Sequence, residues 1–276
     1  MATNLVPPPI ALTIAGSDSG GGAGIQADLK TFHQFGVHGT SVLVAITAQN
    51  TVGVRSVHLV PAEIISAQIA ALAEDLPPAA LKTGMLATAD LIRLVAREIR
   101  ERKWSRYVQD PVMVATSGDR LLATAAESAL REELLPLAAL VTPNLDEAEV
   151  LTGLTVRDPE GMKAAGDRLL DMGARAALIK GGHLGGDEIV DLLVAPGMTR
   201  RFAYSRIRTS STHGTGCTLS AAITAGLALE RSLDRAVEDG LSYVRRAIET
   251  APALGAGHGP VNHRTPALSP QSSVLR

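Results

Sequence analysis

The sequence predicts an α/β fold in which a mostly parallel sheet carries helices on both faces. Apolar, β-branched runs that end at Gly, Asp or Pro recur along the 276 residues, as buried strands do. Segments with helical spacing lie between these runs, and this alternation is typical of parallel sheets. Apolar residues make up 46% of the chain and charged residues 20%, which is enough for a core buried between layers.

The elements follow in chain order. The expected strands are Ile10–Ala15, Val42–Ile46, Tyr107–Val112, Ala138–Thr142 and Ala176–Lys180. Helical spacing is clearest at Leu91, Ile92, Val95 and Ile99 after a Thr88 cap, and at Met162, Ala165, Leu169 and Met172 between Asp158-Pro159 and Gly173. Alternation around Arg200–Ile207 predicts a half-exposed strand, which precedes a long apolar helix, Thr218–Leu229, and an amphipathic helix from about Leu233 to Ile248.

No change of composition marks a domain boundary, so a single domain is expected over residues 10–264. Residues 1–9 and 265–276 are rich in Pro and Ser and have little to bury, and mobile ends are expected there. Parallel sheets bind ligands at the carboxyl ends of their strands, so chemistry is expected in the loops that follow the strands.

Charge and cysteine content narrow the class of protein. The net charge of −2 creates no field that would attract nucleic acid or an anionic membrane. No apolar run is long enough to span a membrane, because charged residues, Gly or Pro interrupt each of them. The single cysteine excludes an internal disulfide, and the N-terminus lacks the pattern of a secretory signal. A cytoplasmic protein is expected.

The segment His213-Gly214-Thr215-Gly216-Cys217 stands directly before a predicted helix, so its backbone N–H groups can hold anionic oxygens. Such donors stabilise the charge that builds up in phosphoryl transfer, which makes the loop a candidate anion hole. A thiol at a helix N-terminus has a lowered pKa, so Cys217 is a candidate base for a substrate hydroxyl. The alternative is a tight turn with a buried cysteine and a structural histidine.

A second glycine cluster, Gly16–Gly24, follows the first expected strand. Gly22, Gly24 and Ala27 fit a dinucleotide spacing, but the acidic residue expected about 20 positions later is missing, so nicotinamide binding is excluded. No G-x-x-x-x-G-K-[ST] motif occurs either. The cluster is expected to let a ring-shaped substrate lie against backbone, with a flexible turn as the alternative. Asp18 within it is expected to be a turn or cap residue.

Seven segments together resemble one family. They are Gly16–Asp28, Ala48–Asn50, Lys82–Leu86, Asp110–Met113, Thr142–Asn144, Lys180–His183 and Thr212–Cys217. Their order and spacing, over roughly Ile10 to His263, resemble the hydroxymethylpyrimidine and phosphomethylpyrimidine kinases of thiamine biosynthesis, within the ribokinase-like superfamily. Each segment alone is a weak signal.

The resemblance implies a three-layer α/β/α sandwich, ATP as phosphoryl donor, Mg²⁺, and a homodimer. It implies two successive phosphorylations of 4-amino-5-hydroxymethyl-2-methylpyrimidine, which end at the diphosphate. It places five residues in the pyrimidine pocket: Gly16, Asp28, Gln49, Met85 and Val112. It places Asn144, Lys180 and Thr215 at ATP, makes Gly214, Thr215 and Gly216 the catalytic loop, and sets Cys217 where related sugar kinases carry an aspartate base.

Side-chain chemistry supports part of this assignment. The Gln49 amide can pair with the ring nitrogen and exocyclic amine of an aminopyrimidine. Met85 and Val112 suit the apolar walls of a ring pocket, and ordinary core packing is their alternative. Asp110 and Glu147 are candidate Mg²⁺ ligands, because this ion takes one or two carboxylates together with phosphate oxygens. Lys180 is a candidate for neutralising donor phosphates, or a strand-end lysine that reaches solvent.

The chain departs from the family at Ser211, where an Asn is common. Two arginines lie nearby, Arg206 and Arg208, and one of them is hypothesised to help hold the phosphate of the monophosphate substrate. Two other functions stay open at this point. One is a pyridoxal kinase, which acts on another ring with a hydroxymethyl group. The other is a non-catalytic pyrimidine-binding sensor with the same pocket, against which the full set of phosphate-handling residues argues.

Overall fold

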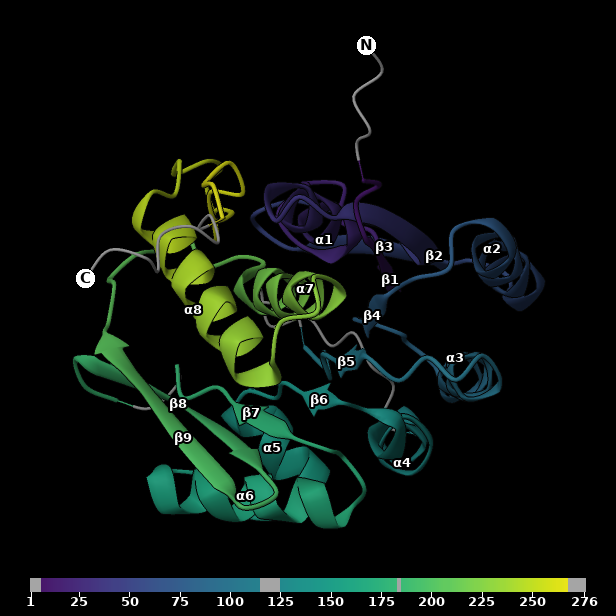
Figure 1. Cartoon of the computed structure of the whole chain (residues 1–276). Coiled ribbons are helices and arrows are strands. Elements are labelled where there is room, and N and C mark those ends of the chain that lie inside the picture. The colour runs from purple at the N-terminus through teal and green to yellow at the C-terminus, as the bar shows by residue number, and fades with distance from the viewer. Residues whose placement is uncertain (1–5, 115–124, 183–184, 268–276) are drawn as a thin grey trace.

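The computed structural model describes residues 6–114, 125–182 and 185–267. Within these residues nine strands form one sheet in the order β3-β2-β1-β4-β5-β6-β7-β8-β9 (Figure 1). The strands are β1 (Ile10–Gly16), β2 (His38–Gln49), β3 (Val54–Leu59), β4 (Ala80–Thr83), β5 (Tyr107–Gln109), β6 (Leu140–Val141), β7 (Ala177–Ile179), β8 (Glu188–Ala195) and β9 (Met198–Ser205). The helices are α1 (Gly24–Gln34), α2 (Ala62–Asp75), α3 (Ala89–Glu101), α4 (Ala126–Ala129), α5 (Leu145–Thr152), α6 (Pro159–Asp171), α7 (Thr215–Ala228) and α8 (Leu233–Glu249).

The middle of the sheet is parallel, from β2 through β1, β4, β5 and β6 to β7, and antiparallel strands flank it. From β1 the chain first moves outward to β2 and then returns to place β4 on the other side of β1. The strand order therefore reverses between β1 and β4. At such a point the loops after neighbouring strands diverge and leave a crevice at their carboxyl ends.

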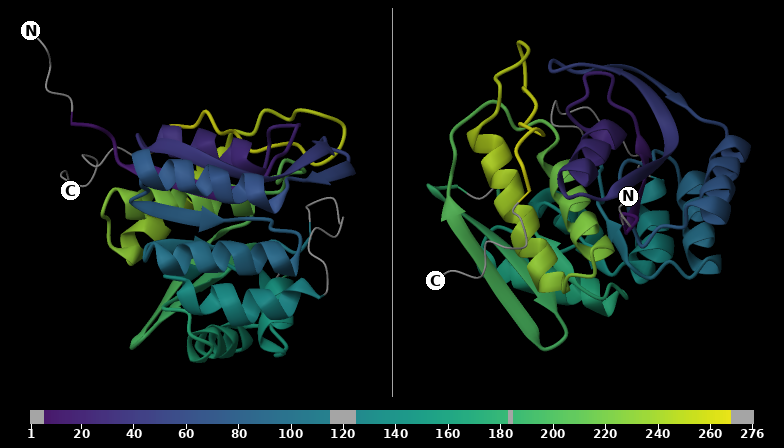
Figure 2. Two further views of the ribbon diagram at one scale, coloured as in Figure 1. Left: turned by 90° about the vertical axis from the view of Figure 1, so that its right-hand side faces the viewer. Right: turned by 45° about the horizontal axis from the view of Figure 1, so that its top comes forward.

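Helices cover both faces of the sheet, as expected (Figures 1 and 2). Helices α1, α7 and α8 pack on one face around a core that includes Phe32, Ile223 and Tyr243. Helices α2 to α6 pack on the other face around a core that includes Ile65 and Ile92. The predicted three-layer α/β/α architecture is thus confirmed.

Helix α7 is buried on all sides because it lies between the sheet and α8. Every residue from Thr218 to Ala228 is buried. Glycines allow the close approach of the two helices, since a Cβ on Gly226 would lie 2.8 Å from the Ala236 Cβ and one on Gly240 would lie 3.0 Å from the Ile223 Cγ1. This central position holds the N-terminus of α7 above the carboxyl edge of the strands.

Most expected elements occur within one to four residues of the expected bounds. The helix expected at Thr218–Leu229 begins earlier, at Thr215, after Gly214 takes up a left-handed conformation with φ 82°. The last residues of the predicted anion loop are therefore the first turn of α7. Strands β3, β4 and β8 and helix α2 were not predicted. Strand β3 is mostly exposed and β4 has four residues, so both give little periodic signal. Strand β8 and helix α2 have 8 and 14 residues and are mainly apolar, so length and charge do not explain why they were not predicted.

The expected mobile ends fall mainly on residues 1–5 and 268–276, which lie outside the described residues. At the described edge of the C-terminal segment, the Thr265 side chain is buried and pairs with the Thr250 hydroxyl at 3.0 Å. Across the described ranges, no helix combines the length and the apolar character needed to cross a membrane.

Candidate active site

A cavity of about 720 Å³ runs along the carboxyl edge of the sheet. Its lining extends from Gln49, at the end of β2, to Arg245 on α8, and includes the first turn of α7. The cavity brings together all but one of the predicted site residues: Gly16, Gln49, Met85, Asp110, Val112, Asn144, Glu147, Lys180, Gly214, Thr215, Gly216 and Cys217. These residues come from seven segments of the chain, so the structure unites what the sequence only suggested.

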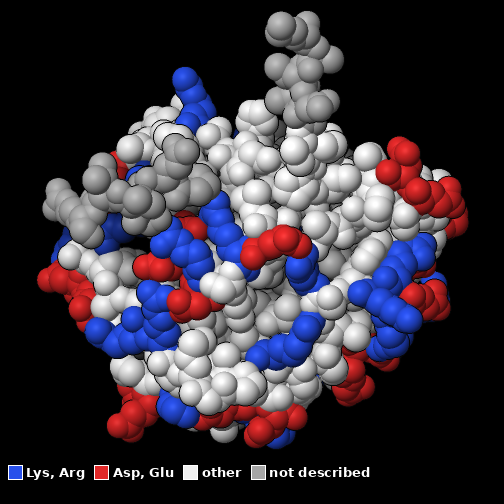
Figure 3. Space-filling view, in the orientation of Figure 1, with Lys and Arg blue, Asp and Glu red and all other residues white. Residues whose placement is uncertain are grey.

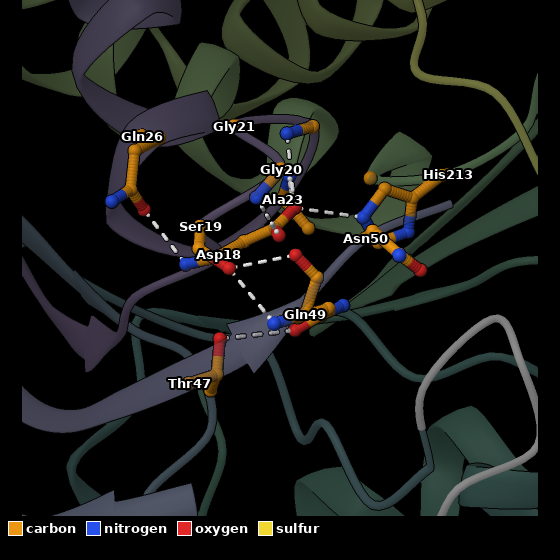
Figure 4. A network of polar contacts seen from close by, with 12 residues as sticks. Asp18, Ser19, Gly20, Gly21, Ala23, Gln26, Thr47, Gln49, Asn50 and His213 are labelled. Atoms are coloured by element: carbon orange, nitrogen blue, oxygen red, sulfur yellow. Dashed lines mark hydrogen bonds and ion pairs between the residues drawn. The ribbon is translucent and has the colours of Figure 1, made fainter. Parts of the chain in front are cut away.

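At one end of the cavity the loop after β1 is organised by the Asp18 carboxylate (Figure 4). It accepts hydrogen bonds from the backbone N–H groups of Gly20, Gly22 and Ala23 at 2.8 to 2.9 Å. It also lies 2.8 Å from Nε2 of His213. Burial alone would raise the pKa of Asp18, but the bonds from His213 and the amides hold it below its ordinary value. Asp18 is therefore an ionised acceptor, and His213 Nε2 carries the hydrogen between them.

Gln49 is fixed to the same loop through its backbone. Its N–H donates to Ser19 Oγ at 2.8 Å, and that hydroxyl donates to the Gln49 carbonyl at 2.7 Å. The side-chain Oε1 lies 3.4 Å from the Thr47 hydroxyl, as the close view shows (Figure 4). The amide stands at the cavity wall, where it can meet the edge of a ring.

Met85 and Gly16 form one close contact at the cavity wall. A Cβ on Gly16 would lie 2.6 Å from the Met85 Cε, so glycine makes room for this side chain. Met85 is buried and Val112 is partly buried against the apolar core. Both therefore serve core packing and line the cavity, and the two readings of these residues do not exclude each other.

Asp28 is the predicted pocket residue that the structure places elsewhere. Its Oδ1 lies 2.8 Å from Nζ of Lys82, and its Oδ2 accepts a hydrogen bond of 2.6 Å from the Thr13 hydroxyl. Both charged side chains are fully buried, and of the two only Lys82 lines the cavity. Burial opposes the lysine charge, but the Asp28 carboxylate raises the pKa of Lys82 above its ordinary value. Asp28 thus supports a cationic wall.

The first turn of α7 lies in the middle of the cavity, where its backbone N–H groups are a ready anion site. Gly214 packs so tightly on the loop after β1 that a Cβ there would lie 1.8 Å from the Gly22 carbonyl oxygen. A Cβ on Gly216 would lie 3.5 Å from Lys180 Nζ and 3.9 Å from Asp110 Oδ2. The first turn of α7 therefore borders the loop after β1 on one side and charged groups on the other.

Cys217 lines the cavity, but its thiol is not activated as the sequence suggested. Burial raises the pKa of Cys217 to about 12, and the nearby Asp28 and Asp110 add to this rise although Lys82 opposes it. The expectation of a lowered thiol pKa is wrong for the ligand-free protein. Loss of hydration is the largest effect on the thiol, and it outweighs the Lys82 charge and the backbone hydrogen bond from Gly24, which both lower the pKa.

Asp110, Glu147 and Lys180 form a charged group at the ends of β5, β6 and β7. Lys180 Nζ lies 3.6 Å from Asp110 Oδ1 and 3.9 Å from Glu147 Oε2. Burial opposes the lysine charge, but the two carboxylates raise the pKa of Lys180. Asp110 also accepts a hydrogen bond of 3.1 Å from the Ser220 hydroxyl on α7. Two acidic oxygens and one cation thus face the cavity together.

Glu147 is a buried carboxyl group whose surroundings disfavour its ionised form. Burial raises its pKa to about 7, and Asp110 adds to the rise while Lys180 and backbone N–H groups oppose it. Its Oε2 accepts the Asn144 N–H at 2.8 Å, and Asn144 Oδ1 accepts the Glu147 N–H at 2.9 Å. This capping box begins α5 and fixes both side chains at the cavity. Asn144 is thus placed by a local helix signal.

The structure adds residues at the far end of the cavity that the sequence did not single out. Asp191 on β8 accepts a hydrogen bond from the Gly181 N–H at 2.8 Å and another from the Tyr204 hydroxyl. The Arg245 guanidinium lies over the Tyr204 ring, 5.6 Å from its centroid. In β9, Tyr204 alternates with exposed residues. This alternation predicted a half-exposed strand, and it was the only feature of the sequence that pointed to this side of the cavity.

The two hypothesised phosphate arginines lie on the Lys180 side of the sheet, away from Gln49. Arg206 lines the cavity, and its guanidinium donates to the carbonyl oxygens of Gly182 and Gly186 at 2.8 and 2.9 Å. Arg208 is exposed and pairs with Asp187 at 2.7 Å. Both arginines thus brace the loop after β7. Ser211 is buried, and its N–H donates to the Thr209 hydroxyl.

Outside the cavity, basic and acidic side chains alternate over the face in Figure 3. Within the described ranges, no group of three or more His, Cys, Asp or Glu side chains has the geometry to hold a metal ion by itself. A metal at Asp110 and Glu147 would thus need oxygens from another source. This limitation agrees with Mg²⁺, which completes its shell with phosphate and water.

The fold, the anion-binding helix terminus and the lysine between two carboxylates define a small-molecule kinase. The family model described as phosphomethylpyrimidine kinase matches residues 18–262, and the chain belongs to this family. The family expected from the sequence is thereby confirmed.

Individual relatives agree with this assignment. The hydroxymethylpyrimidine/phosphomethylpyrimidine kinase of Rhizobium meliloti is 53% identical over 257 residues, which cover 92% of this chain and 96% of that protein. The solved phosphomethylpyrimidine kinase from Clostridium difficile is 43% identical with a TM-score of 0.79, over 87% of this chain and 99% of that chain. An ADP complex of Bacillus subtilis pyridoxal kinase is 38% identical with a TM-score of 0.86, over 93% of this chain and 98% of that chain.

Proposed function

We propose that this protein uses ATP to phosphorylate the hydroxymethyl group of 4-amino-5-hydroxymethyl-2-methylpyrimidine, and then phosphorylates the monophosphate to the diphosphate, in thiamine biosynthesis. The observation that carries the proposal is the order of groups in one cavity: Gln49 ends β2 on one side, the first turn of α7 lies between the loop after β1 and Lys180, and Lys180 follows β7 on the other side. A ring, a phosphoryl group in transfer and donor phosphates fit this order.

The acceptor ring is proposed to lie between Gly16, Met85 and Val112, with the Gln49 amide at its polar edge. One carbonyl and one NH₂ group on the same side chain complement a ring nitrogen next to an exocyclic amine. A buried polar group that loses its partner is costly, so this pair favours aminopyrimidines over rings without the amine. Asp28 is proposed to act on this site through Lys82 and not by contact.

The N–H groups of Gly214, Thr215, Gly216 and Cys217 are proposed to surround the γ-phosphoryl oxygens during transfer. The transition state of this chemistry is loose, so positioning and charge stabilisation contribute more than proton removal. Cys217 is proposed to accept a hydrogen bond from the acceptor hydroxyl through its sulfur. Its thiol is neutral in the ligand-free protein and cannot take up a second proton, so Cys217 can remove the hydroxyl proton only after the loaded site has ionised the thiol.

The donor is proposed to extend from the anion hole past Lys180 and Asn144 toward Asp191 and Tyr204. The residues fit Mg²⁺ with ATP phosphates, because Asp110 and Glu147 offer two buried carboxylates within 4.0 Å of the same ammonium group. Mg²⁺ would supply charge neutralisation between donor phosphates. Lys180, through its ammonium group, and Thr215 would hold the same phosphates from the protein side.

A second candidate function is pyridoxal phosphorylation, which the likeness to the Bacillus subtilis pyridoxal kinase favours. A coupled assay of ADP release with the pyrimidine, its monophosphate and pyridoxal, with and without Mg²⁺, tests both. The pyrimidine should give the higher kcat/KM by at least about tenfold, because pyridoxal lacks the amine that Gln49 pairs with. A higher kcat/KM for pyridoxal would reverse the assignment.

A homodimer in the cytoplasm is proposed from the family resemblance. Sedimentation velocity of the full chain at micromolar concentration tests the assembly. A single species at twice the chain mass of 28.7 kDa is expected, and a species at the chain mass would contradict it.

A further inference from the structure

Two loops that are far apart in the sequence are joined at one side chain. His213 Nε2 lies 2.8 Å from Asp18 Oδ2, and the two residues are 195 positions apart (Figure 4). Asp18 organises the loop that borders the acceptor ring, and His213 directly precedes the anion hole. Both side chains are more than nine-tenths buried.

The backbones of the two loops also meet at this point. The Gly22 carbonyl oxygen lies where a Cβ of Gly214 would be, at 1.8 Å, and a Cβ on Gly22 would lie 2.6 Å from the His213 Cδ2. Behind the histidine, its own N–H donates to the Gly259 carbonyl at 3.0 Å. The His213 ring is therefore held between the acceptor loop and the C-terminal segment.

We propose that His213 is a positioning residue that, through Asp18, keeps the anion hole in register with the acceptor loop. This inference rests on the proposed function. The ring reaches the network through Gln49 and Ser19, whereas the phosphoryl group sits on the turn that begins at Gly214. The gap between the attacking oxygen and phosphorus is then set by how the two loops dock. Transfer requires a gap of about 3 to 3.5 Å, and an error of about 1 Å costs about 100-fold in rate.

The role depends on one donor atom. Asp18 already binds three backbone N–H groups, and the Nε2–H of His213 is its fourth donor and the only one from the other loop. A glutamine carries an amide nitrogen at about the reach of Nε2, whereas the amide of asparagine ends at the reach of Nδ1. A group that merely fills space would show no preference for glutamine over asparagine.

The test compares His213→Gln, His213→Asn and His213→Ala in steady-state kinetics, with the dissociation constants of the pyrimidine and a non-hydrolysable ATP analogue from calorimetry. The alanine and asparagine variants should lose about 30- to 100-fold in kcat, with both dissociation constants within about threefold of wild type. The glutamine variant should recover most of the loss. His33→Ala, an exposed histidine on α1, is the matched control and should leave kcat unchanged.

A double-variant cycle isolates the pair. Asp18→Asn combined with His213→Ala should be about as slow as Asp18→Asn alone, because the asparagine already weakens the contact with His213 together with the bonds to the backbone N–H groups. The proposal would be overturned if the losses in kcat of the two single variants multiplied in the double variant. Equal kcat for His213→Gln and His213→Asn would also overturn it. Should the alanine variant not fold, the Gln and Asn variants still decide the question. A wild-type protein inactive on the pyrimidine would instead contradict the proposed function, and the variants would then be compared with the acceptor that it does phosphorylate.

Discussion

The ammonium group of Lys82 lies 2.8 Å from the Asp28 carboxylate, and both side chains are wholly out of contact with solvent. The Thr13 hydroxyl completes the pair at 2.6 Å. Such a pair adds little net stability over an apolar one, but breaking it leaves a lone buried charge. The pair reaches the cavity through Lys82. The positive charge of Lys82 lowers the pKa of the neighbouring Cys217 thiol, in opposition to burial.

Asp28→Asn should therefore destabilise the protein by about 3 to 5 kcal/mol, because it leaves the Lys82 charge buried without a counterion. Urea unfolding at pH 7.5, followed by circular dichroism, measures the change. The matched control is Asp90→Asn, which breaks an exposed pair with Arg93 and should leave the midpoint unchanged within error. Equal stability of Asp28→Asn and wild type would mean that the pair is not intact in solution.

Cys217 should react slowly with iodoacetamide, because only the thiolate is nucleophilic and burial raises its pKa to about 12. The alkylation rate should climb about tenfold per pH unit up to pH 9.5 without a plateau. The chain has one cysteine, so mass spectrometry of the intact protein follows the reaction directly. The same protein in urea is the control, and its rate should level off above pH 9, as for an ordinary thiol. A plateau below pH 8 in the folded protein would restore the thiolate predicted from the sequence.

Cys217→Ala should lower kcat by two or more orders of magnitude, the scale of a proton-accepting group in the transition state. The steady-state rate with saturating ATP and pyrimidine measures this. Binding of both ligands should be little changed, since the thiol is neutral in the ligand-free protein. Turnover close to wild type would reduce Cys217 to a packing residue, and the acceleration would then belong to the anion hole.

Much of the architecture could be predicted because its strands are continuous apolar runs and its helices show clear caps. Thr88 and Asp158 begin α3 and α6 as their sequences indicate. Strand β4 escaped prediction because it is four residues long and contains Lys82, a residue type that is almost never fully buried without a partner. Its partner, Asp28, is 54 residues away, and no local pattern reveals that distance.

The sequence placed Gln49, Asp110 and Lys180 at the ends of strands, and the structure brings all three to the wall of one cavity, while their roles stay predictions. The candidate site was predicted poorly where environment decides the chemistry. A helix N-terminus favours a thiolate, but desolvation of the half-buried Cys217 thiol reverses the outcome, and desolvation is not visible in a five-residue motif. The contact of His213 with Asp18 was likewise hidden by sequence distance.

Glu147 should make stability depend on pH. Its pKa is raised from 4.5 unfolded to about 7 folded, so the folded state binds the extra proton between these values. Stability from this group is therefore greatest below about pH 4.5, falls as pH rises to 7, and is constant above. Glu147→Gln keeps the capping box and removes the charge, so it should gain up to about 3 kcal/mol over wild type at pH 8, since one pKa unit corresponds to about 1.4 kcal/mol.

Urea unfolding of wild type and Glu147→Gln at pH 5 and pH 8, without nucleotide or Mg²⁺, tests this dependence. The advantage of the variant should grow with pH. Glu63→Gln, an exposed change in the first turn of α2, is the control and should show no such growth. An advantage that stays constant from pH 5 to pH 8 would show that Glu147 is already ionised at pH 5.

Lys180→Met tests the donor end of the cavity. The ammonium lies between Asp110 and Glu147, so its loss removes a cation from the donor phosphates and leaves two carboxylates without their shared counterion. We expect kcat to fall by about 100- to 1,000-fold, as when one preorganised electrostatic donor is removed, and KM for ATP to rise. Initial rates over a range of ATP and Mg²⁺ concentrations measure both effects.

Lys163→Met, which breaks an exposed pair on α6, is the control and should leave both parameters unchanged. If Lys180→Met kept its kcat and its KM for ATP, the lysine would serve only to neutralise the two carboxylates, and the donor phosphates would have to be held by the anion hole and Mg²⁺ alone.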